Sequence, residues 1–436
     1  RADDAENSYR RALEINPAHA TAYFNLGNVL ADQERLEDAL EAYRKAVSLD
    51  NANAEKHYNY ANTALKLDRF EDAVESFRRA LEIDDEYLDA LCNMGSALQS
   101  LGRLDEAIAG YHRALSLAGD DDDTTDLHWN LSLALLQNGD YEEGWREYDW
   151  RWRTPTFAEF RRDWEKPEWA GEALDGKTVL VHAEQGFGDA IQFCRFAPLV
   201  AERGGRVVLE SRAPLTRLFG TLEGVAERID LGAPVPDHDF QVPLMTLPRV
   251  FGTTVETVPA DVPYLAPPEG AEPDPRIKEA KGLKVGFAWA GSPTRRDNIK
   301  RSARLADFEP LFRVEGVTFF SLQVGPFQPE LEDLDEGLGV IDLAGGLEDF
   351  GDTAAAVQAL DLVISVDTAV LHVAGALAKP AWGLMSRPTG FFWMDERTDS
   401  SWYPTVRLFR QPEVGDWAPV FAGAEKELAA LAKKKA

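Results

Sequence analysis

Two short segments combine carboxylate, hydroxyl and imidazole side chains with small residues, a composition that suits a binding or catalytic turn. Residues 184–189 read Glu-Gln-Gly-Phe-Gly-Asp. The glycines permit close approach of the backbone to a ligand, and the carboxylates can accept a proton from a hydroxyl group. In the second segment, Thr368 stands four residues before His372, which places both side chains on one face of a helix.

The second segment predicts an anion-binding helix start. The apolar run 362–365 reads as a buried strand, and Asp367 or Thr368 would cap the helix that follows. The free N–H groups of Thr368, Ala369 and Val370 would then point into a cleft and can bind a diphosphate. An ordinary capped helix of an α/β unit is the alternative interpretation, because such caps are common.

The first segment leaves the identity of a base open. His182, Glu184 and Asp189 lie at or after the end of a strand predicted at 178–182, and geometry alone does not separate Glu184 from Asp189. The glycines also suggest a dinucleotide-binding turn. However, Ile191 replaces the third glycine of that fingerprint, and Asp189 would set a carboxylate against the pyrophosphate. An oxidoreductase is therefore the least favoured interpretation.

Alternating strands and helices are expected to position both segments. Apolar runs predict five strands, two before and three after a Pro-rich stretch at 259–275, and a helix over 189–200. These runs are residues 178–182, 206–210, 283–289, 317–322 and 362–365. Such alternation is typical of parallel sheets covered by helices, with ligands bound at the strand ends. We therefore expect two Rossmann-like halves around a cleft.

A basic loop follows the first strand of the second half. Residues 290–294 read Ala-Gly-Ser-Pro-Thr, and Arg295, Arg296, Lys300 and Arg301 come after them. The whole chain of 436 residues carries 46 basic and 75 acidic residues and a net charge of −29. In so acidic a protein, a basic cluster indicates an anion site. A solvated loop is the alternative.

The first third of the chain repeats every 34 residues, which is the period of the tetratricopeptide repeat. Each copy has a small residue followed by an aromatic one, and this combination lets paired helices approach and fills the gap to the next pair. The small residues are Ala39, Ala73 and Ala107, and the aromatic residues are Tyr43, Phe77 and Tyr111. A degenerate fourth copy begins near Thr125. Because the chain starts with Arg1 and inside a repeat, we expect its natural N-terminus to lie upstream.

One asparagine occupies the same place in each first helix of a repeat. These residues are Asn25, Asn59, Asn93 and Asn130. The pattern resembles the asparagine ladder of tetratricopeptide-bearing protein O-glycosyltransferases, which implies a groove that clamps the backbone of an acceptor protein through amide donors and acceptors. The alternative is that the asparagines only stabilise contacts between helices.

The composition disfavours several other partners and locations. A strongly acidic surface repels phosphate backbones, so nucleic acid is a poor partner. Cys92 and Cys194 form no metal-binding spacing, and their scarcity favours a reducing compartment. No apolar run is long enough to span a bilayer, and no signal peptide is evident. We therefore expect a cytoplasmic protein that is not inserted in a membrane.

The second part of the chain resembles the heptosyltransferase-like family of GT-B glycosyltransferases. The likeness rests on Asp-Thr-x-x-x-His-x-Ala at 367–374 and on Gly-x-Gly-Asp at 186–189. It implies that Asp189 is the base and that the donor site contains Ser292, Thr294, Lys300, Asp367, Thr368, Ala369 and His372. It also implies diphosphate binding without metal or other cofactor. Ala369 departs from the usual glycine, a change that a backbone N–H contact tolerates.

The combination of repeats and this catalytic half is similar to bacterial tetratricopeptide glycosyltransferases, a group that includes flagellin O-glycosyltransferases. It implies a helical solenoid followed by a GT-B pair of Rossmann-like domains. The expected boundaries are 1–150 for the solenoid, 151–175 for a Trp-rich connection, 176–265 for the first half, 266–282 for a linker and 283–436 for the donor half.

The resemblance implies an inverting, metal-independent transfer of a sugar from a sugar nucleotide to a hydroxyl group of a protein that the solenoid recruits. One alternative keeps the enzyme and changes the acceptor to a glycolipid or lipopolysaccharide. Another is a catalytically inactive scaffold. The joint presence of Asp189, Lys300, Asp367, Thr368 and His372 argues against the scaffold.

Overall fold

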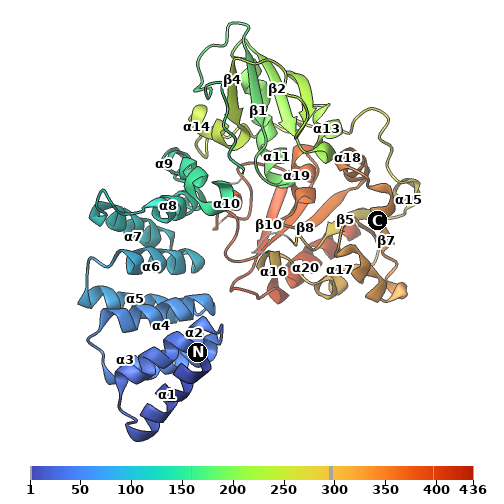
Figure 1. The fold of residues 1–436 in the computed structure, drawn as a ribbon. Helices are drawn as coiled ribbons and strands as arrows, with labels where there is room; N and C mark the ends of the chain where they lie inside the picture. The colour runs from blue at the N-terminus through green and yellow to red at the C-terminus, as the bar shows by residue number, and fades with distance from the viewer. Residues whose placement is uncertain (1, 159, 294–297, 396, 436) are drawn as a thin grey trace. The chain divides into compact units, whose positions relative to one another are not determined.

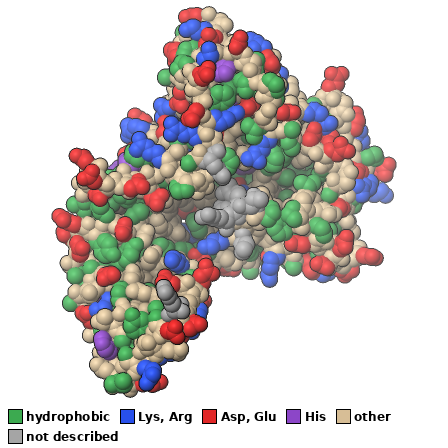
Figure 2. Space-filling view, viewed as in Figure 1, with side chains coloured by type: hydrophobic (Ala, Val, Ile, Leu, Met, Phe, Trp, Pro, Cys, Tyr) green, Lys and Arg blue, Asp and Glu red, His purple; other side chains and the backbone are tan. Residues whose placement is uncertain are grey.

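The computed structural model describes residues 2–158, 160–293, 298–395 and 397–435. Internal contacts divide the chain into a unit of residues 1–158 and a unit of residues 159–436, which are described separately. The first unit is helical and the second contains two parallel sheets, so the expected α and α/β fold class is confirmed. Figure 2 shows acidic side chains spread over the visible face of both units, in keeping with the net charge of −29.

Consecutive helices form pairs in the first unit (Figure 1). The first helices of the pairs are α2 (Ala20–Asp32), α4 (Ala54–Lys66), α6 (Leu88–Ser100) and α8 (Thr125–Asn138). The second helices are α3 (Leu36–Leu49), α5 (Phe70–Ile83), α7 (Leu104–Leu117) and α9 (Tyr141–Glu147). Helix α1 (Ala2–Ile15) precedes the pairs, and η1 (Tyr148–Arg153) and α10 (Pro155–Ala158) follow them.

Glycine on a first helix lets an aromatic ring of the second helix lie against its backbone. A Cβ atom on Gly27 would lie 2.6 Å from the ring of Tyr43, and one on Gly95 would lie 2.5 Å from the ring of Tyr111. Both rings are buried, and the Tyr43 hydroxyl donates to Asn28 Oδ1 at 2.7 Å. The rings therefore have no room to move away, and the two helices are held in one register.

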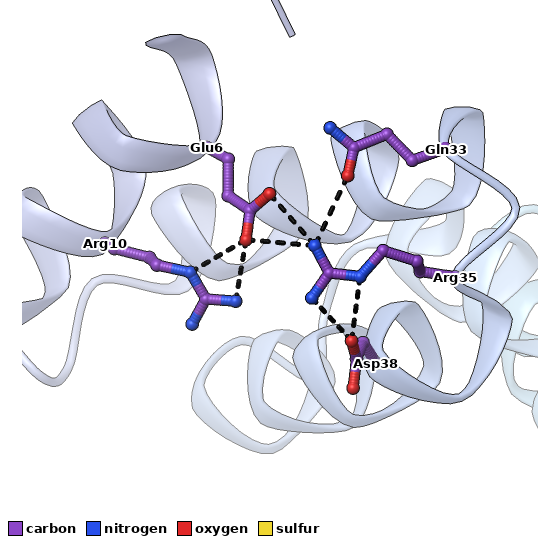
Figure 3. Close-up of polar contacts among 5 residues, drawn as sticks. All are labelled: Glu6, Arg10, Gln33, Arg35 and Asp38. Carbon is purple, nitrogen blue, oxygen red and sulfur yellow. Dashed lines mark hydrogen bonds and ion pairs between the residues drawn. The ribbon is translucent and has the colours of Figure 1, made fainter. Parts of the chain in front are cut away.

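Ion pairs tie α1 to the turn between α2 and α3 (Figure 3). Arg35 donates to Glu6 at 3.1 Å and to Asp38 at 2.6 Å. Glu6 also accepts from Arg10 at 2.9 Å, and the hydrogen bonds from Arg10 and Arg35 lower the pKa of the Glu6 carboxyl group. Because Arg35 is 42% exposed, these pairs orient α1 more than they stabilise it.

The contact between Gly27 and Tyr43 predicts that alanine at position 27 destabilises the solenoid, whereas alanine at position 110, where there is room, stabilises it. Gly27→Ala should lower the free energy of unfolding of the solenoid by roughly 1–3 kcal/mol, the usual cost of overpacking. Gly110→Ala on α7 is the control, because its new Cβ would meet only the Leu91 carbonyl oxygen at 4.0 Å. It should stabilise the helix by about 0.5–1 kcal/mol. Urea unfolding followed by circular dichroism measures both, and a Gly27→Ala variant as stable as wild type would contradict the close packing.

The second unit begins with a sheet of four parallel strands in the order β3-β2-β1-β4. The strands are β1 (Thr178–His182), β2 (Arg206–Ser211), β3 (Val225–Asp230) and β4 (Phe240–Pro243). The helices around it are α11 (Phe187–Phe193), η2 (Cys194–Phe196), α12 (Ala197–Ala201), α13 (Ala213–Phe219), η3 (Leu244–Thr246) and α14 (Leu247–Val250). The single helix expected over 189–200 is interrupted at η2, because Pro198 has no N–H group with which to continue the ladder of hydrogen bonds.

A second sheet of six parallel strands follows, in the order β10-β9-β8-β5-β6-β7. The strands are β5 (Leu283–Ala288), β6 (Val317–Ser321), β7 (Ile341–Asp342), β8 (Leu362–Val366), β9 (Ala381–Met385) and β10 (Val406–Arg410). Counted from β5, this is the strand order of the Rossmann fold. The order reverses between β5 and β8, and ligands of such folds bind beyond the strand ends at that point.

The remaining helices connect and cover the second sheet. They are α15 (Pro275–Glu279), α16 (Asn298–Arg301), η4 (Leu305–Phe308), α17 (Glu309–Phe312), η5 (Gln328–Asp333), η6 (Glu336–Leu338), η7 (Ala344–Gly346), α18 (Phe350–Ala359), α19 (Ala369–Ala376), η8 (Phe391–Trp393) and α20 (Ala418–Lys435). Helix α11 of the first half packs against α19, and α13 packs against α18 (Figure 1). The two Rossmann-like halves therefore meet through helices that follow their strand ends.

One buried guanidinium group joins the two halves. Arg195, which is 4% exposed, donates to the carbonyl oxygens of Trp402 at 2.6 Å and Pro259 at 3.2 Å. It also donates to the hydroxyl of Tyr264 at 2.9 Å, and it lies 4.6 Å from the ring centre of Tyr403. Pro259 and Tyr264 belong to the connection between the halves, and Trp402 belongs to the C-terminal region. The guanidinium group therefore bonds the first half to both of these segments.

Removal of this guanidinium should destabilise the second unit. Arg195→Met leaves buried oxygen acceptors without donors, and we expect a loss of about 2–4 kcal/mol in the free energy of unfolding. Arg206→Met is the control, because the Arg206 side chain is 44% exposed and its pair with Glu227 should contribute less than about 1 kcal/mol. Denaturant unfolding followed by tryptophan fluorescence distinguishes the two variants. Equal stability of both would show that Arg195 does not hold the junction.

Candidate functional site

The start of α19 has unused backbone donors. Thr368 precedes the helix at its capping position, but its side chain does not cap the first turn and instead bonds the Ser365 hydroxyl at 2.9 Å. Within the described part of the chain, the N–H groups of Ala369 and Val370 meet no protein acceptor. The helix dipole and these N–H groups together favour an anion at this point.

Asp367 directly precedes this helix start, and basic side chains lie beside its carboxylate. Arg301 Nη2 lies 3.1 Å from the carboxylate and also donates to the Asp367 carbonyl oxygen, while His372 Nε2 lies 3.8 Å from the carboxylate. Burial would raise the pKa of Asp367, but the charge of Arg301 and the hydrogen bond with His372 outweigh it and hold the pKa below its ordinary 3.8. Asp367 therefore stays ionised and orients Arg301.

His372 connects the two motifs that the sequence singled out. Its Nδ1 is 3.0 Å from the Tyr403 hydroxyl, and a Cβ atom on Gly188 would lie 2.8 Å from the imidazole ring. The turn before α11 thus reaches the helix that begins at Thr368. Trp402 and Tyr403 are wholly buried, so both aromatic side chains belong to the core.

The three candidate bases differ in burial. Asp189 stands in the first turn of α11, is half-buried, and accepts the Gly186 N–H at 3.1 Å. Glu184 is 6% exposed. His182 is 5% exposed and bonds Gln241 at 2.9 Å, so it is part of the packing of the sheet. Asp189 is therefore the most accessible of the three, and the choice between Asp189 and Glu184 stays a prediction.

The basic loop contributes a contact to Asp367, and the donor-binding role of Lys300 stays a prediction. Ser292 and Lys300 are exposed, and Thr294 lies outside the described residues, together with Arg295 and Arg296. Arg301, which the sequence placed only in the basic cluster, is the residue that reaches Asp367. Spacing alone does not reveal this, because neighbouring residues of a single helical turn project in different directions.

Two groups of side chains outside these motifs have structural partners. The carboxylate of Glu210, where a dinucleotide fold would bind ribose, is 1% exposed and is paired with both terminal nitrogens of Arg162. Asp239 accepts the Thr178 N–H at 2.8 Å, and His238 bonds the Pro236 carbonyl at 2.9 Å. Among the residues that the structure describes, no three His, Cys, Asp or Glu side chains gather in an arrangement that could hold a metal ion.

The asparagines of the solenoid bond to neighbouring repeats. Asn59 Nδ2 donates to Asn28 Oδ1 at 3.2 Å, and Asn93 Nδ2 donates to Asn62 Oδ1 at 3.5 Å. Asn130 Nδ2 lies 3.8 Å from the sulfur of Cys92. These bonds agree with the alternative that the asparagines stabilise contacts between helices. Each amide oxygen can still accept from another group, so the ladder function of Asn25 and its equivalents stays a prediction.

In the described ranges, no helix has both the length and the apolar character needed to cross a lipid bilayer.

The pairing of Asp367 with Arg301 predicts a pH-dependent effect of substitution. In wild type, the lowered pKa stabilises the fold above pH 3.8, and this contribution is lost as the pH falls below that value. In Arg301→Met, burial would instead raise the pKa of Asp367, so stability would fall as the pH rises above about 4. We expect Arg301→Met to cost about 1–3 kcal/mol at pH 7 and less at pH 4.

Two controls accompany this measurement by denaturant unfolding. Arg304→Met removes a side chain that is 84% exposed and should cost under about 0.5 kcal/mol at either pH. Adding Asp367→Asn to Arg301→Met should remove the extra loss at pH 7. A cost of Arg301→Met that does not change with pH would contradict the assigned pairing.

The comparisons with known proteins identify the first unit. The tetratricopeptide repeat family matches residues 1–55 and 92–148 in one form and residues 54–87 in another. The helix pairs are therefore tetratricopeptide repeats, as the sequence predicted, and they indicate a protein-binding function.

One curated relative matches more than the repeats. Protein FlbA of Caulobacter vibrioides is 28% identical over 338 residues, which cover 69% of this chain and 54% of FlbA. The chain thus spans about half the length of this relative. Since 338 residues exceed the helical unit of residues 1–158, the similarity extends into the α/β unit.

Three solved structures of tetratricopeptide proteins are similar to part of this chain. MamA is 25% identical, covers 34% of this chain and 85% of its own, and gives a TM-score of 0.32. YrrB, described as a tetratricopeptide protein with an unusual peptide-binding site, is 26% identical, with coverages of 34% and 75% and a TM-score of 0.30. The second tetratricopeptide domain of human RPAP3 with an HSP70 peptide is 28% identical, with coverages of 26% and 93% and a TM-score of 0.25. Scores this low carry no argument about this chain.

Proposed function

We propose that the α/β unit is a glycosyltransferase of the GT-B class that moves a sugar from a sugar nucleotide to a hydroxyl group of a protein. The observation that carries the proposal is the close approach of Gly188 to His372, with a Cβ-to-ring distance of 2.8 Å. Asp189 follows Gly188 in the chain, so its carboxylate would lie close to α19, whose start is the proposed anion site. A base from one half and a leaving-group site from the other then meet, as transfer between two substrates requires.

The start of α19 would hold the diphosphate of the donor. The N–H groups of Ala369 and Val370 supply neutral donors, and Arg301 and Lys300 supply positive charge nearby. Arg301 bonds Asp367 through Nη2, which leaves Nη1 for a phosphate oxygen. These groups would stabilise the charge that develops on the diphosphate as its bond to the sugar breaks.

Asp189 would act as the general base. Its place in the first turn of α11 sets the carboxylate at the positive end of the helix dipole, which favours a negative charge. In the proposed inverting step, the acceptor oxygen forms a bond to the anomeric carbon while the bond to the diphosphate breaks on the opposite side. The hydroxyl proton passes to Asp189. Glu184 is the alternative base.

The solenoid would recruit the acceptor protein. Tetratricopeptide repeats indicate protein binding, and the chain joins them to the proposed transferase in one polypeptide. Flagellin-like proteins are the acceptors that the sequence resemblance suggests. We propose that the concave row of Asn25, Asn59, Asn93 and Asn130 contacts the backbone of the acceptor through the amide oxygens that the bonds between repeats leave available.

Substitution of the base tests this function. Asp189→Asn keeps the bond from Gly186 and removes the basic site, so it should cut turnover by about 10²–10⁴-fold and leave donor affinity nearly unchanged. Release of nucleotide from a panel of sugar nucleotides, with a protein acceptor and EDTA present, measures turnover without added metal. Asp237→Asn is the control, because Asp237 is an exposed carboxylate of the same half.

Three results would revise the proposal. Normal turnover in Asp189→Asn together with an inactive Glu184→Gln would move the role of base to Glu184. If wild type releases nucleotide from no sugar nucleotide under any of these conditions, the assignment as a glycosyltransferase is wrong. Activity that EDTA abolishes and Mg²⁺ restores would overturn the metal-free mechanism.

A further inference from the structure

A cavity of about 540 Å³ opens at the C-terminal end of β5. Its walls come from the loop after β5, from α16 and η4, and from η5. The volume lies within the range of sites for small molecules. Among the described residues, none of those expected to bind the donor lines it.

The cavity combines aromatic surface with acceptors. Trp289 and Phe327 contribute rings, and Glu309, Glu330 and Asp333 contribute carboxylates. The indole N–H of Trp289 donates to Glu330 at 2.8 Å, which fixes that carboxylate against the ring. Ionised carboxylates only accept hydrogen bonds, so these walls favour a flat ligand that carries N–H donors.

Asn298 supplies the opposite polarity. It is 5% exposed and lines the cavity, and its Oδ1 accepts the Ser302 hydroxyl at 3.0 Å. Its amide nitrogen is thereby left as the donor, and among the described residues it bonds no protein atom. A ligand that satisfies both walls needs an acceptor beside a donor group.

The cavity adjoins the proposed diphosphate site through α16. Asn298 and Ser302 line the cavity, and Arg301 from the same helical turn reaches Asp367. Residues three and four apart on a helix project from one side. One small molecule with a flat end and an anionic end can therefore contact both groups.

We propose that this cavity takes the base of the sugar nucleotide and selects a base with an exocyclic amine, namely cytosine, adenine or guanine, over uracil. The inference rests on the proposed function and names the class of its donor. The amine would donate to a carboxylate of the cavity, and the adjacent ring nitrogen or carbonyl would accept from Asn298. Uracil has a carbonyl in place of the amine, and two acceptors would then face each other.

Calorimetry on the full chain with nucleoside diphosphates tests the selection. The matched pairs are CDP with UDP and ADP with IDP, in which a carbonyl replaces the amine, and GDP with IDP, in which a hydrogen atom replaces it. We expect the amine-bearing member of the tightest-binding pair to bind at least about 10-fold better, the usual scale for a hydrogen bond to a charged group. Asp333→Asn and Glu309→Gln should each reduce that ratio, and Glu332→Gln on the same η5 segment, outside the cavity, should not.

Four results would overturn the assignment of the cavity to the base. Equal affinities within all three pairs, or a ratio that both cavity variants leave unchanged, would overturn the base assignment and leave the diphosphate site standing. A preference for the carbonyl member would do the same. If none of the nucleotides binds, the base assignment and the proposed transferase function both fall.

Discussion

The α/β unit depends on one buried positive charge. A guanidinium group loses its hydration when it is buried, so protein acceptors must replace the water. For Arg195, the acceptors come from Pro259, Tyr264 and Trp402. These residues belong to segments that the chain reaches only after completing the first sheet. The charge is therefore tolerable only when both halves and their connection are folded, and this makes the arrangement cooperative.

The same junction orients the candidate site. The ring of Tyr403 lies beside Arg195, and burial raises the pKa of Tyr403 well above its usual value. The hydroxyl therefore stays protonated and can donate to His372 Nδ1 at 3.0 Å. The remaining proton of a neutral imidazole then lies on Nε2, toward Asp367 at 3.8 Å. A contact made for stability thus sets the direction in which His372 presents its N–H group.

Periodicity predicted the elements with strong patterns and missed those without them. The run 178–182 coincides with β1, and the repeats coincide with the helix pairs. Strands β3 and β4 were not expected, because β3 is only partly buried and β4 has four residues. The interruption at η2 was readable from the sequence, since Pro198 lacks the N–H group that a continuous α-helix would use there.

The sequence predicted which segments form the candidate site, but not which side chains contact one another there. The turns at 186–189 and 367–372 do lie together, because both follow strand ends. The donor-binding role of Lys300 stays a prediction, while the contact of Arg301 with Asp367 had no signal in the sequence. The role of Arg195 depends on acceptors more than 60 residues away, and no local pattern could reveal it.

The glycines of the solenoid have a consequence for how such a chain can grow. Gly27 faces Tyr43 and Gly95 faces Tyr111, and each pair lies within one repeat. In the intervening repeat, Ala61 stands in place of the glycine and Phe77 in place of the tyrosine. The added methyl group of alanine thus accompanies a ring that lacks the hydroxyl group. The two sizes vary together inside a unit of 34 residues. Gene duplication or deletion of one whole unit carries both partners, so the array can lengthen or shorten during evolution without disturbing the fit of any ring.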